Sequence, residues 1–506
     1  MKNKIITIDD AKNIASGLRA KNKKIILCHG VFDLLHIGHI DYLSESKSVA
    51  DILIVSLTED KHVNKGPNRP VFNQMQRARA IAALQIVDHV VINNSSNAIN
   101  LIKSIKPNLY SKGRDYKNLS SDITGMIKKE KDAIKSVGGD IYFAQTPLSS
   151  STKIMNTYEM VFDQDQSNLI KKVKKELNSS NIQDWIERLC KINVLVVGEL
   201  IVDEYVFCEA LGKSGKEPVL ALRNTNTERY AGGVAAIARH LSSFVQNINL
   251  ISYLGEKQEH LSFFKKSMPK NINLDVIAKS SSPSIVKKRF IEKINGHKLL
   301  GVYDLDEKPL NKVDKNILEN KLRKTIKISD LIIVVDYGHG LLSNSSLKIL
   351  TGNSKFKALN AQINSSNIGH HTMSKYKNYD LVIINETELR HEYRDRESGV
   401  EVLMRKLQKD ISPITLVVTQ GRGGAKALVK GSKAIISCPA FASKVIDKVG
   451  SGDAMLSLLS ICLCAKLPIH FSLLISSLAA AHSVETVGNK EPFSKKSLMK
   501  ILQHSL

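Results

Sequence analysis

Short apolar runs alternate with stretches of helical period through the first part of the chain. The apolar runs lie at 24–28, 51–56, 88–92 and 140–143. Helical periodicity is found at 39–49, 74–86 and 96–105. Continuous apolar runs are typical of strands buried on both faces, and their alternation with helices predicts an α/β domain with a parallel sheet.

The same alternation returns in the second part of the chain. A new unit opens with Val194-Leu-Val-Val-Gly198, and further apolar runs lie at 247–253, 331–335, 381–384 and 416–419. The segment between the two parts is more polar, with a charged amphipathic stretch at 168–177 that Asn178-Ser-Ser-Asn181 interrupts. We therefore predict two α/β domains, 1–155 and 191–506, joined by a helical polar linker at 156–190.

The most apolar region, 454–487, predicts core helices and no membrane insertion. Lys466, Pro468 and His470 divide it into two pieces, and a membrane-spanning helix needs about 20 apolar residues. The N-terminal segment carries acidic residues and has no unbroken apolar run, so it does not predict a secretory signal. Six cysteines are scattered through apolar stretches, as expected of free thiols in a reducing cytoplasm.

Composition and charge add little to this picture. The chain has 506 residues and a formal net charge of +24, and its lysines are spread over the whole length without a dense basic block or interleaved aromatics. We expect two or three domains, no nucleic-acid partner, and an attraction for phosphorylated substrates.

Candidate chemistry in the first part follows the strand at 24–28. That strand leads into His29-Gly30-Val-Phe32-Asp33-Leu-Leu-His36-Ile-Gly38-His39, and a helix follows. Gly30 allows a close approach of the backbone to a phosphate, and Gly38 leaves room for a nucleotide. His36 and His39 are three residues apart at a helix start, so both rings can face an α-phosphate that gains charge during attack.

This motif resembles the HxGH motif of the cytidylyltransferase-like nucleotidyltransferases. Further segments, Lys65-Gly-Pro-Asn-Arg69-Pro, Gln76-Arg77 and Ser111-Lys112-Gly, resemble the nucleotidyltransferase half of bifunctional ADP-heptose synthases. Ser149-Ser150-Ser151-Thr152 resembles the SSTxI motif of the wider superfamily, and on its own it would indicate only a helix N-cap. The resemblance implies a Rossmann-like fold, His36 and His39 as catalytic groups, and ATP as the nucleotide, with CTP as the alternative. It also implies a site for nucleotide and phosphate at Gly30, Phe32, Asp33, Gly38, Lys65, Arg77, Lys112, Ser150, Ser151 and Thr152. Arg114 departs from the pattern, because a second glycine is usual there.

Candidate chemistry in the second part is concentrated in Asp447-Lys-Val-Gly450-Ser451-Gly452-Asp453, directly before a long apolar helix. Glycines at the start of a helix expose backbone N–H groups that can bind an anion, and the helix dipole assists. An aspartate in that first turn can take a proton from an attacking sugar hydroxyl. The alternative is an acidic helix cap after a flexible loop.

Companion motifs resemble those of the ribokinase/PfkB carbohydrate kinases. They are Gly198-Glu-Leu-Ile-Val-Asp203, Ala231-Gly232-Gly233, Asp336-Tyr-Gly-His339-Gly340, Asn385-Glu-Thr-Glu388 and Thr419-Gln-Gly421-Arg-Gly-Gly424. The resemblance implies Asp453 as the catalytic base, with ATP and its γ-phosphate bound by Asn385, Glu388, Thr419, Gly421, Gly424, Gly450, Ser451 and Gly452. It implies sugar binding by Asp203, Gly232 and Gly233, and Mg²⁺ near Asn385, Glu388 and the phosphates without direct protein ligands. Ala236, His339 and Lys448 depart from the family pattern, which expects asparagine, lysine and threonine.

Together the two resemblances imply a cytoplasmic bifunctional enzyme of nucleotide-sugar synthesis. One half would phosphorylate a sugar, by resemblance heptose 7-phosphate at its anomeric hydroxyl, and the other would join a sugar 1-phosphate to ATP, giving ADP-heptose and pyrophosphate. The known heptose enzyme carries its kinase first, whereas here the order is reversed. Two alternatives stay open: a CTP-dependent transferase fused to a kinase for another sugar, and one half that only binds ligand. The kinase resemblance also implies a small β-sheet lid, with candidates near 204–225 and 284–304, and a homodimer or higher homo-oligomer.

Overall fold

The computed structural model describes residues 4–63, 69–113, 126–145, 162–177, 182–294, 296–363, 367 and 371–505. The chain forms two compact units. The first contains residues 1–164 and 496–506, and the second contains residues 165–495. We describe each unit by itself.

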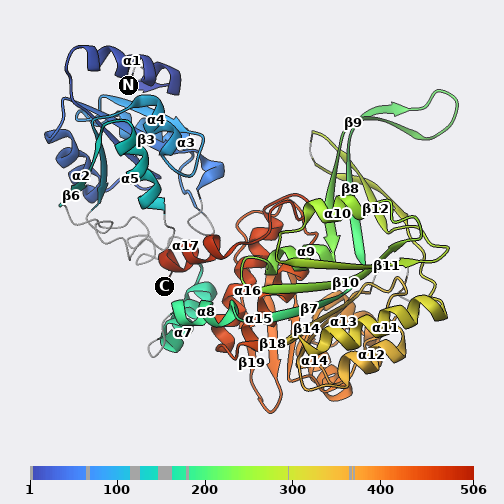
Figure 1. Ribbon diagram of the computed structural model, residues 1–506. Coiled ribbons are helices and arrows are strands. Elements are labelled where there is room, and N and C mark those ends of the chain that lie inside the picture. Colours follow the sequence, from blue (N-terminus) through green and yellow to red (C-terminus); the bar gives the residue numbers. More distant parts are fainter. Residues whose placement is uncertain are drawn as a thin grey trace. The chain divides into compact units, whose positions relative to one another are not determined.

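The first unit is built on a six-stranded sheet in the order β1-β4-β3-β2-β5-β6, in which every neighbouring pair is parallel (Figure 1). Its strands are β1 (Ile5–Ile6), β2 (Ile25–Gly30), β3 (Ile52–Thr58), β4 (His89–Asn93), β5 (Leu109–Gly113) and β6 (Asp140–Ala144). The chain moves outward from β2 through β3 to β4, and then crosses to the other side of β2 for β5 and β6. The strand order therefore reverses beside β2, and ligands of such sheets bind outside the carboxyl ends of the strands at that point.

Helices cover both faces of this sheet. They are α1 (Ile8–Ala20), α2 (Ile37–Ser48), α3 (Gln74–Ala82), α4 (Ile99–Ile105) and α5 (Met126–Ser136), with a 3₁₀ turn η2 (Asp60–His62). Successive residues of β2 enter opposite cores: Ile26 packs with side chains of α2 and α3, and Ile25 and Leu27 pack with those of α1, α4 and α5. Because both faces are buried, β2 is apolar from Ile25 to Cys28, which explains why its position was predictable.

The second unit contains a nine-stranded sheet in the order β11-β10-β7-β14-β15-β16-β17-β18-β19. The strands are β7 (Asn193–Gly198), β10 (Asn247–Gly255), β11 (Ile272–Lys279), β14 (Leu331–Asp336), β15 (Phe356–Ala361), β16 (Leu381–Asn385), β17 (Thr415–Thr419), β18 (Ala425–Val429) and β19 (Ile435–Cys438). Pairing is parallel from β11 to β17 and antiparallel for β18 and β19. Parallel strands that alternate with helices confirm the expected α/β class.

Helices also cover both faces of the larger sheet, with α9, α15 and α16 on one side and α11 to α14 on the other (Figure 1). Those before α13 are α7 (Gln164–Leu177), α8 (Ile182–Leu189), α9 (Val234–Leu241), α10 (Leu261–Ser267), α11 (Lys312–Lys327) and α12 (Asn344–Thr351). The others are α13 (Glu386–Tyr393), α14 (Val400–Ile411), α15 (Ser451–Cys464) and α16 (Ile469–Val484), with 3₁₀ turns η5 (Met373–Lys375) and η6 (Gly421–Gly423). The last helix, α17 (Lys495–Ser505), groups with the first unit apart from its first residue. The apolar region 454–487 forms α15 and α16, whose side chains are mostly buried.

A separate small sheet completes the second unit, in the order β13-β12-β8-β9. Its strands are β8 (Leu200–Lys213), β9 (Leu220–Gly233), β12 (Val286–Glu292) and β13 (Lys298–Asp304), so the predicted small β-sheet is confirmed. The hairpin of β8 and β9 extends beyond the other two strands (Figure 1).

Helices α7 and α8, expected in the linker, group with the second unit. The Gln166 side chain donates to the carbonyl of Ala440, and Glu176 pairs with His470 at 2.6 Å. The domain limits 1–155, 156–190 and 191–506 stay predictions.

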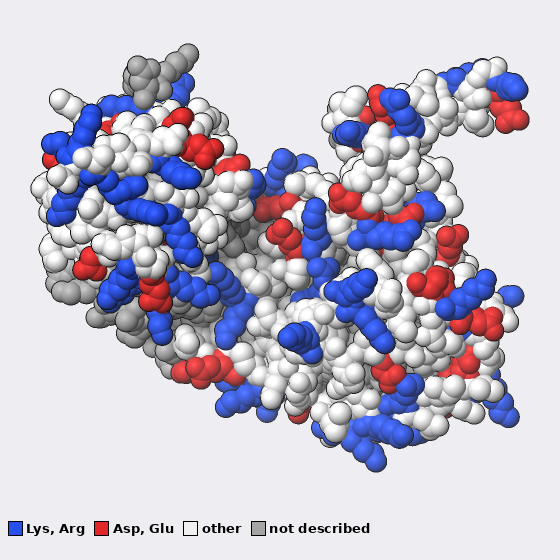
Figure 2. Space-filling view, turned by 45° about the horizontal axis from the view of Figure 1, so that its top comes forward, with Lys and Arg blue, Asp and Glu red and all other residues white. Residues whose placement is uncertain are grey.

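Among the described helices, none combines the length and apolarity needed to cross a membrane. Lys and Arg side chains are spread over the visible face of both units, with Asp and Glu among them, and form no single basic block there (Figure 2).

Candidate functional site

The first candidate site lies where β2 ends and α2 begins, at the reversal of strand order. His36 is the N-cap of α2, and its Nδ1 accepts a hydrogen bond from the backbone N–H of Gly38 at 3.1 Å. The ring of His39 lies 4.0 Å from that of His36 between centroids, so the structure brings the two histidines together as predicted. Burial lowers the pKa of His36, so the ring is neutral at pH 7, and an accepting Nδ1 leaves the proton on Nε2.

Asp33 holds the chain beside this histidine pair. Its Oδ1 accepts from the backbone N–H groups of Val71 and Phe72 at 2.8 and 3.1 Å, and its Oδ2 pairs with Arg69 at 2.7 Å. The side chains of Asp33 and Arg69 are both buried. Asp33, predicted at the nucleotide, therefore positions the segment that follows the loop of Lys65, which itself lies outside the described residues.

Arg77, on α3, was predicted to reach the triphosphate, and the structure places it differently. Its guanidinium donates to the carbonyls of Phe72, Val31 and Thr58 at 2.9, 2.5 and 2.8 Å, and to Asp60 at 2.6 Å. The residue is 1% exposed. Arg77 thus ties together the segments that follow β2 and β3, because its donors are directed at the protein.

Lys112, at the end of β5, pairs with Glu130 of α5 at 2.9 Å. Burial raises the pKa of Glu130, but Lys112 and the backbone N–H of Ala98 more than offset this, and the carboxyl stays ionised. His29, at the neighbouring end of β2, has its pKa lowered to about 4 by burial and by Lys112. The other predicted phosphate ligands, Ser150, Ser151 and Thr152, lie outside the described residues.

The remaining residues of this site shape its loop. Phe32 has a positive φ of 47°, and its ring lies 5.3 Å from that of His39 between centroids. A Cβ on Gly30 would approach the Phe32 ring to 3.0 Å. Gly38 is buried in the first turn of α2, next to His39. These residues fit a narrow loop that presents the histidine pair and the positive end of the α2 dipole.

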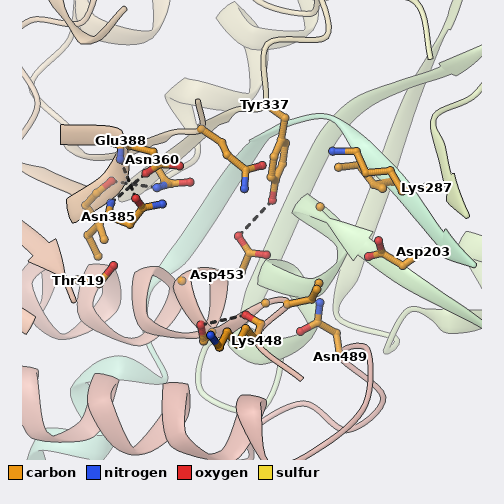
Figure 3. A pocket seen from close by; sticks show the side chains of 18 of the residues that line it. Asp203, Lys287, Tyr337, Asn360, Asn385, Glu388, Thr419, Lys448, Asp453 and Asn489 are labelled. Atoms are coloured by element: carbon orange, nitrogen blue, oxygen red, sulfur yellow. Dashed lines mark hydrogen bonds between the residues drawn. The ribbon is translucent and has the colours of Figure 1, made fainter. Parts of the chain in front are cut away.

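The second candidate site is a cavity of about 370 Å³ in the second unit, which we call the Asp453 cavity (Figure 3). Asp453, in the first turn of α15, accepts from the hydroxyl of Tyr337 at 3.1 Å. Burial raises the pKa of Asp453 to about 7; the Tyr337 hydroxyl and Lys287 oppose this, and Asp203 adds to it. A carboxyl with this pKa can accept a proton near neutral pH.

The turn before Asp453 is held open by glycine geometry and by Asp447. Gly450 has φ +88°, and a Cβ there would lie 1.8 Å from Oδ1 of Asn489. Asp447, which is buried, accepts from the backbone N–H of Val449 at 3.1 Å, from the Tyr205 hydroxyl at 2.6 Å and from Lys298 at 2.7 Å. Gly450, Ser451 and Gly452 all line the cavity, so the predicted anion site and base are brought together.

One end of the cavity carries Asn385, Glu388 and Thr419 (Figure 3). Asn385 caps α13: its Oδ1 accepts from the N–H of Glu388 at 2.8 Å, and the Glu388 carboxylate accepts from the N–H of Asn385 at 2.9 Å. Burial raises the pKa of Glu388 to about 7. Gly421 and Gly424 shape the turn after β17, where a Cβ on Gly424 would lie 2.1 Å from the carbonyl of Cys438.

Mg²⁺, which the kinase resemblance implies, fits this end through phosphate and water. No group of three or more His, Cys, Asp or Glu side chains within the described residues could hold a metal ion. Asn385 and Glu388 already bond each other's backbone, so they suit contact with the water shell of an ion carried by phosphates.

The other end of the cavity carries Asp203, which forms an ion pair with Arg289. Gly232 is required beside it, because a Cβ there would lie 1.9 Å from Oδ2 of Asp203. Gly233 lines the cavity with φ +60° and precedes α9. The three predicted sugar-binding residues therefore meet at one place.

Several cavity residues were missed from the sequence. Lys287 and Arg289 lie on β12, which carries no recognised motif, and Tyr337 belongs to a motif that was noted without assigning its phenol. Glu199 accepts from the N–H groups of Tyr337 and His339 at 3.0 and 3.1 Å, and so positions the loop after β14. Burial, assisted by Asp336, raises the pKa of Glu199 to about 7.

The departures at His339 and Ala236 concern buried positions. His339 is 1% exposed, and burial lowers its pKa to about 4, so it supplies no positive charge at pH 7. Ala236 is also buried, in α9. Lys448, the third departure, lines the Asp453 cavity.

Comparisons with known proteins match both units. A model described as the pfkB family of carbohydrate kinases matches residues 191–496, and a cytidylyltransferase-like model matches residues 27–157. Solved structures that match the chain include the ribokinase of Arabidopsis thaliana (17% identity, 62% of this chain and 99% of that chain, TM-score 0.47). Phosphofructokinase-2 of Escherichia coli is similar at 16% identity, over 62% of this chain and 99% of that chain, with a TM-score of 0.49.

The N-terminal part is similar to proteins named bifunctional protein HldE. The protein of Aliarcobacter butzleri is 41% identical over 138 residues, which cover 27% of this chain and 29% of the relative. That of Campylobacter fetus is 43% identical over 115 residues, or 22% of this chain and 24% of the relative. The chain thus spans less than a third of the length of these relatives.

Proposed function

The chain belongs to the pfkB family of carbohydrate kinases, and on that premise we propose that it is a bifunctional enzyme that phosphorylates a sugar and activates a sugar 1-phosphate with a nucleotide. The observation that carries the kinase half is the placement of Asp453. Its carboxyl, with a pKa of about 7, lies at the glycine-lined start of α15 in a cavity. The paired histidines at the start of α2 carry the other half.

In the kinase half, Asp453 takes the proton of a sugar hydroxyl. The hydroxyl oxygen forms a bond to the γ-phosphorus of ATP as the bond to the bridging oxygen breaks, and ADP leaves. Backbone N–H groups at Gly450 to Gly452 and the positive end of the α15 dipole stabilise the charge on the transferred group. Mg²⁺, when bound on the ATP phosphates near Asn385 and Glu388, neutralises part of their charge.

In the transferase half, an oxygen of a sugar 1-phosphate forms a bond to the α-phosphorus of a nucleoside triphosphate, and pyrophosphate leaves. His36 and His39 donate hydrogen bonds to the α-phosphate oxygens as their charge grows. Asp33 and Arg77 keep the surrounding loops in place.

The finer assignment is heptose 7-phosphate as the kinase substrate, ATP as the nucleotide and ADP-heptose as the product. The similarity to proteins named HldE over the N-terminal part supports it. Position in the cytoplasm and a homo-oligomeric state belong to the same proposal.

Two variants with reciprocal effects test this function. Asp453→Asn should abolish ADP formation from ATP and heptose 7-phosphate and leave pyrophosphate release from ATP and heptose 1-phosphate unchanged. His39→Asn should do the reverse, so each variant controls for the folding of the other. Unchanged kinase turnover in Asp453→Asn would make the second unit a binding module, and pyrophosphate release only with CTP would exclude ADP-heptose as the product.

A further inference from the structure

A row of side chains crosses the small sheet on the face toward the Asp453 cavity. Asp203 of β8 is in register with Lys287 of β12, and Lys287 is in register with Tyr303 of β13. Residues in register on neighbouring strands project from the same face of a sheet. Asp203 and Lys287 line the cavity, whereas the next residue, Lys288, pairs with Glu204 at 3.4 Å. Successive residues of a strand face opposite sides, so Lys288 points away from the cavity.

Lys287 lacks a direct ion-pair partner among the described residues. Asp203 already forms an ion pair with Arg289, which lies on β12 two residues after Lys287. Among the described residues, no carboxylate oxygen lies within 4.0 Å of the Lys287 ammonium, whose recorded contacts are the rings of Tyr337 and Tyr303 at 5.8 and 5.9 Å. Asp203, Glu199 and Asp453 attract Lys287 from a longer distance, but none of them pairs with it directly.

Burying an ammonium group without an ion-pair partner costs free energy unless a bound anion pairs with it. Burial lowers the pKa of Lys287, which shows that the surroundings disfavour its charge. The two tyrosine rings replace only part of the hydration that the buried ammonium loses. An anion in the cavity would supply the missing partner.

The location of Lys287 decides which substrate would carry that anion. Figure 3 shows Lys287 and Asp203 on one side of Asp453, and Asn360, Asn385 and Glu388 on the opposite side. The second group lies at the end assigned to the nucleotide phosphates. An anion at Lys287 therefore belongs to the sugar.

We propose that Lys287 binds a phosphate that the sugar acceptor already carries, and that it makes the kinase selective for phosphorylated sugars. The inference rests on the proposed kinase function. It places the acceptor with one hydroxyl at Asp453 and its own phosphate at the small sheet. Lys287 is then a residue that determines specificity, and the phosphate that it holds is not transferred.

The test compares one sugar with and without its phosphate. Wild type, Lys287→Met, Lys287→Arg and the control Lys288→Met would be assayed for ADP formation with heptose 7-phosphate and with heptose. Loss of a charge-assisted hydrogen bond should raise KM for heptose 7-phosphate in Lys287→Met by about 10- to 100-fold. KM for ATP should stay within about twofold. At a pH where Asp453 is ionised in every variant, kcat/KM should fall far less for heptose than for heptose 7-phosphate. Lys287→Arg should recover most of the loss, and Lys288→Met should match wild type.

Three results would overturn the proposal. An equal rise in KM for ATP would place Lys287 at the transferred phosphate. An equal loss for heptose and heptose 7-phosphate would make it a general positioning residue. Unchanged kinetics in Lys287→Met would leave it no role in acceptor binding.

A binding measurement separates failure of the inference from failure of the function. Titration of heptose 7-phosphate into Asp453→Asn and into the double variant with Lys287→Met needs no turnover. If wild type forms no ADP from either sugar, the kinase proposal fails. A weaker affinity in the double variant would still support an anion site at Lys287, and equal affinities would refute it.

Discussion

Replacing Arg77 by methionine separates two roles for this residue. The sequence motif assigns it to the triphosphate, whereas the structure directs its guanidinium at three backbone carbonyls and at Asp60. Methionine fills a similar volume and removes every donor. The carbonyls of Val31, Thr58 and Phe72 then lose this partner in a buried setting.

The expected cost follows from those contacts. A buried polar group that loses its partner costs about 1–3 kcal/mol. Asp60 is 38% exposed at its side chain and regains water, so it adds little. Counting the three carbonyls at the lower bound gives a loss of about 3 kcal/mol in the stability of the first unit. At about 1.4 kcal/mol for each factor of ten, global exchange of core amides should become about 100-fold faster.

Hydrogen exchange with mass spectrometry measures this loss of stability separately for the first unit of the chain. Trp185, the one tryptophan of the sequence, lies in α8 of the second unit, so its fluorescence would not report on the first. Peptides from β2, β3 and β4 should lose protection in Arg77→Met and keep it in Arg79→Met, which removes an exposed arginine from the same helix. The structural role is refuted if both variants keep wild-type protection while only Arg77→Met raises KM for the nucleotide.

Two further predictions concern the kinase half. The value of kcat/KM for the sugar should rise with pH about a midpoint near 7, because burial raises the pKa of Asp453 to about 7 and only its carboxylate accepts a proton. Tyr337→Phe removes a hydrogen bond that lowers this pKa, so the midpoint should move to higher pH; a rate independent of pH between 6 and 8 would contradict the base role. Gly450→Ala should destabilise the second unit by about 2 kcal/mol from its φ of +88° alone, more if Asn489 cannot move aside, and should abolish kinase turnover, as followed by tryptophan fluorescence and ADP formation. Gly452→Ala, where a Cβ meets nothing within 4 Å, should leave stability unchanged, and equal stability of the two variants would exclude strain at Gly450.

The sequence predicted those strands whose centre is a run of apolar residues. Strands β2, β3, β4 and β14 are buried on both faces, so each contains such a run, with polar residues mainly at its ends. Strand β5 was missed because its sequence, Leu-Tyr-Ser-Lys-Gly, mixes polar and apolar residues at the carboxyl end of the sheet. The small sheet was anticipated from family resemblance alone, since the residues of β13 are exposed and give no burial pattern.

The site residues were predictable where a motif is local, and not where strands distant in sequence meet. His36 and His39 are neighbours on one helix turn, so their spacing implied their contact. Lys287 reaches the cavity because β12 pairs with β8 and places Lys287 beside Asp203. No local sequence pattern predicts this pairing.

Asp447 and Asp453 show why a motif alone does not assign chemistry. Both belong to one glycine-rich segment, and both are buried. Burial raises the pKa of Asp447 as well, but Lys298 and the Tyr205 hydroxyl more than reverse this, so that carboxylate stays charged and holds the turn. Asp453 forms no ion pair within the described residues, and its pKa rises to about 7. Asp453, which has no cation in direct contact, can accept a proton near pH 7 and is therefore suited to catalysis. Asp447, six residues earlier, stays charged and is suited to holding the backbone.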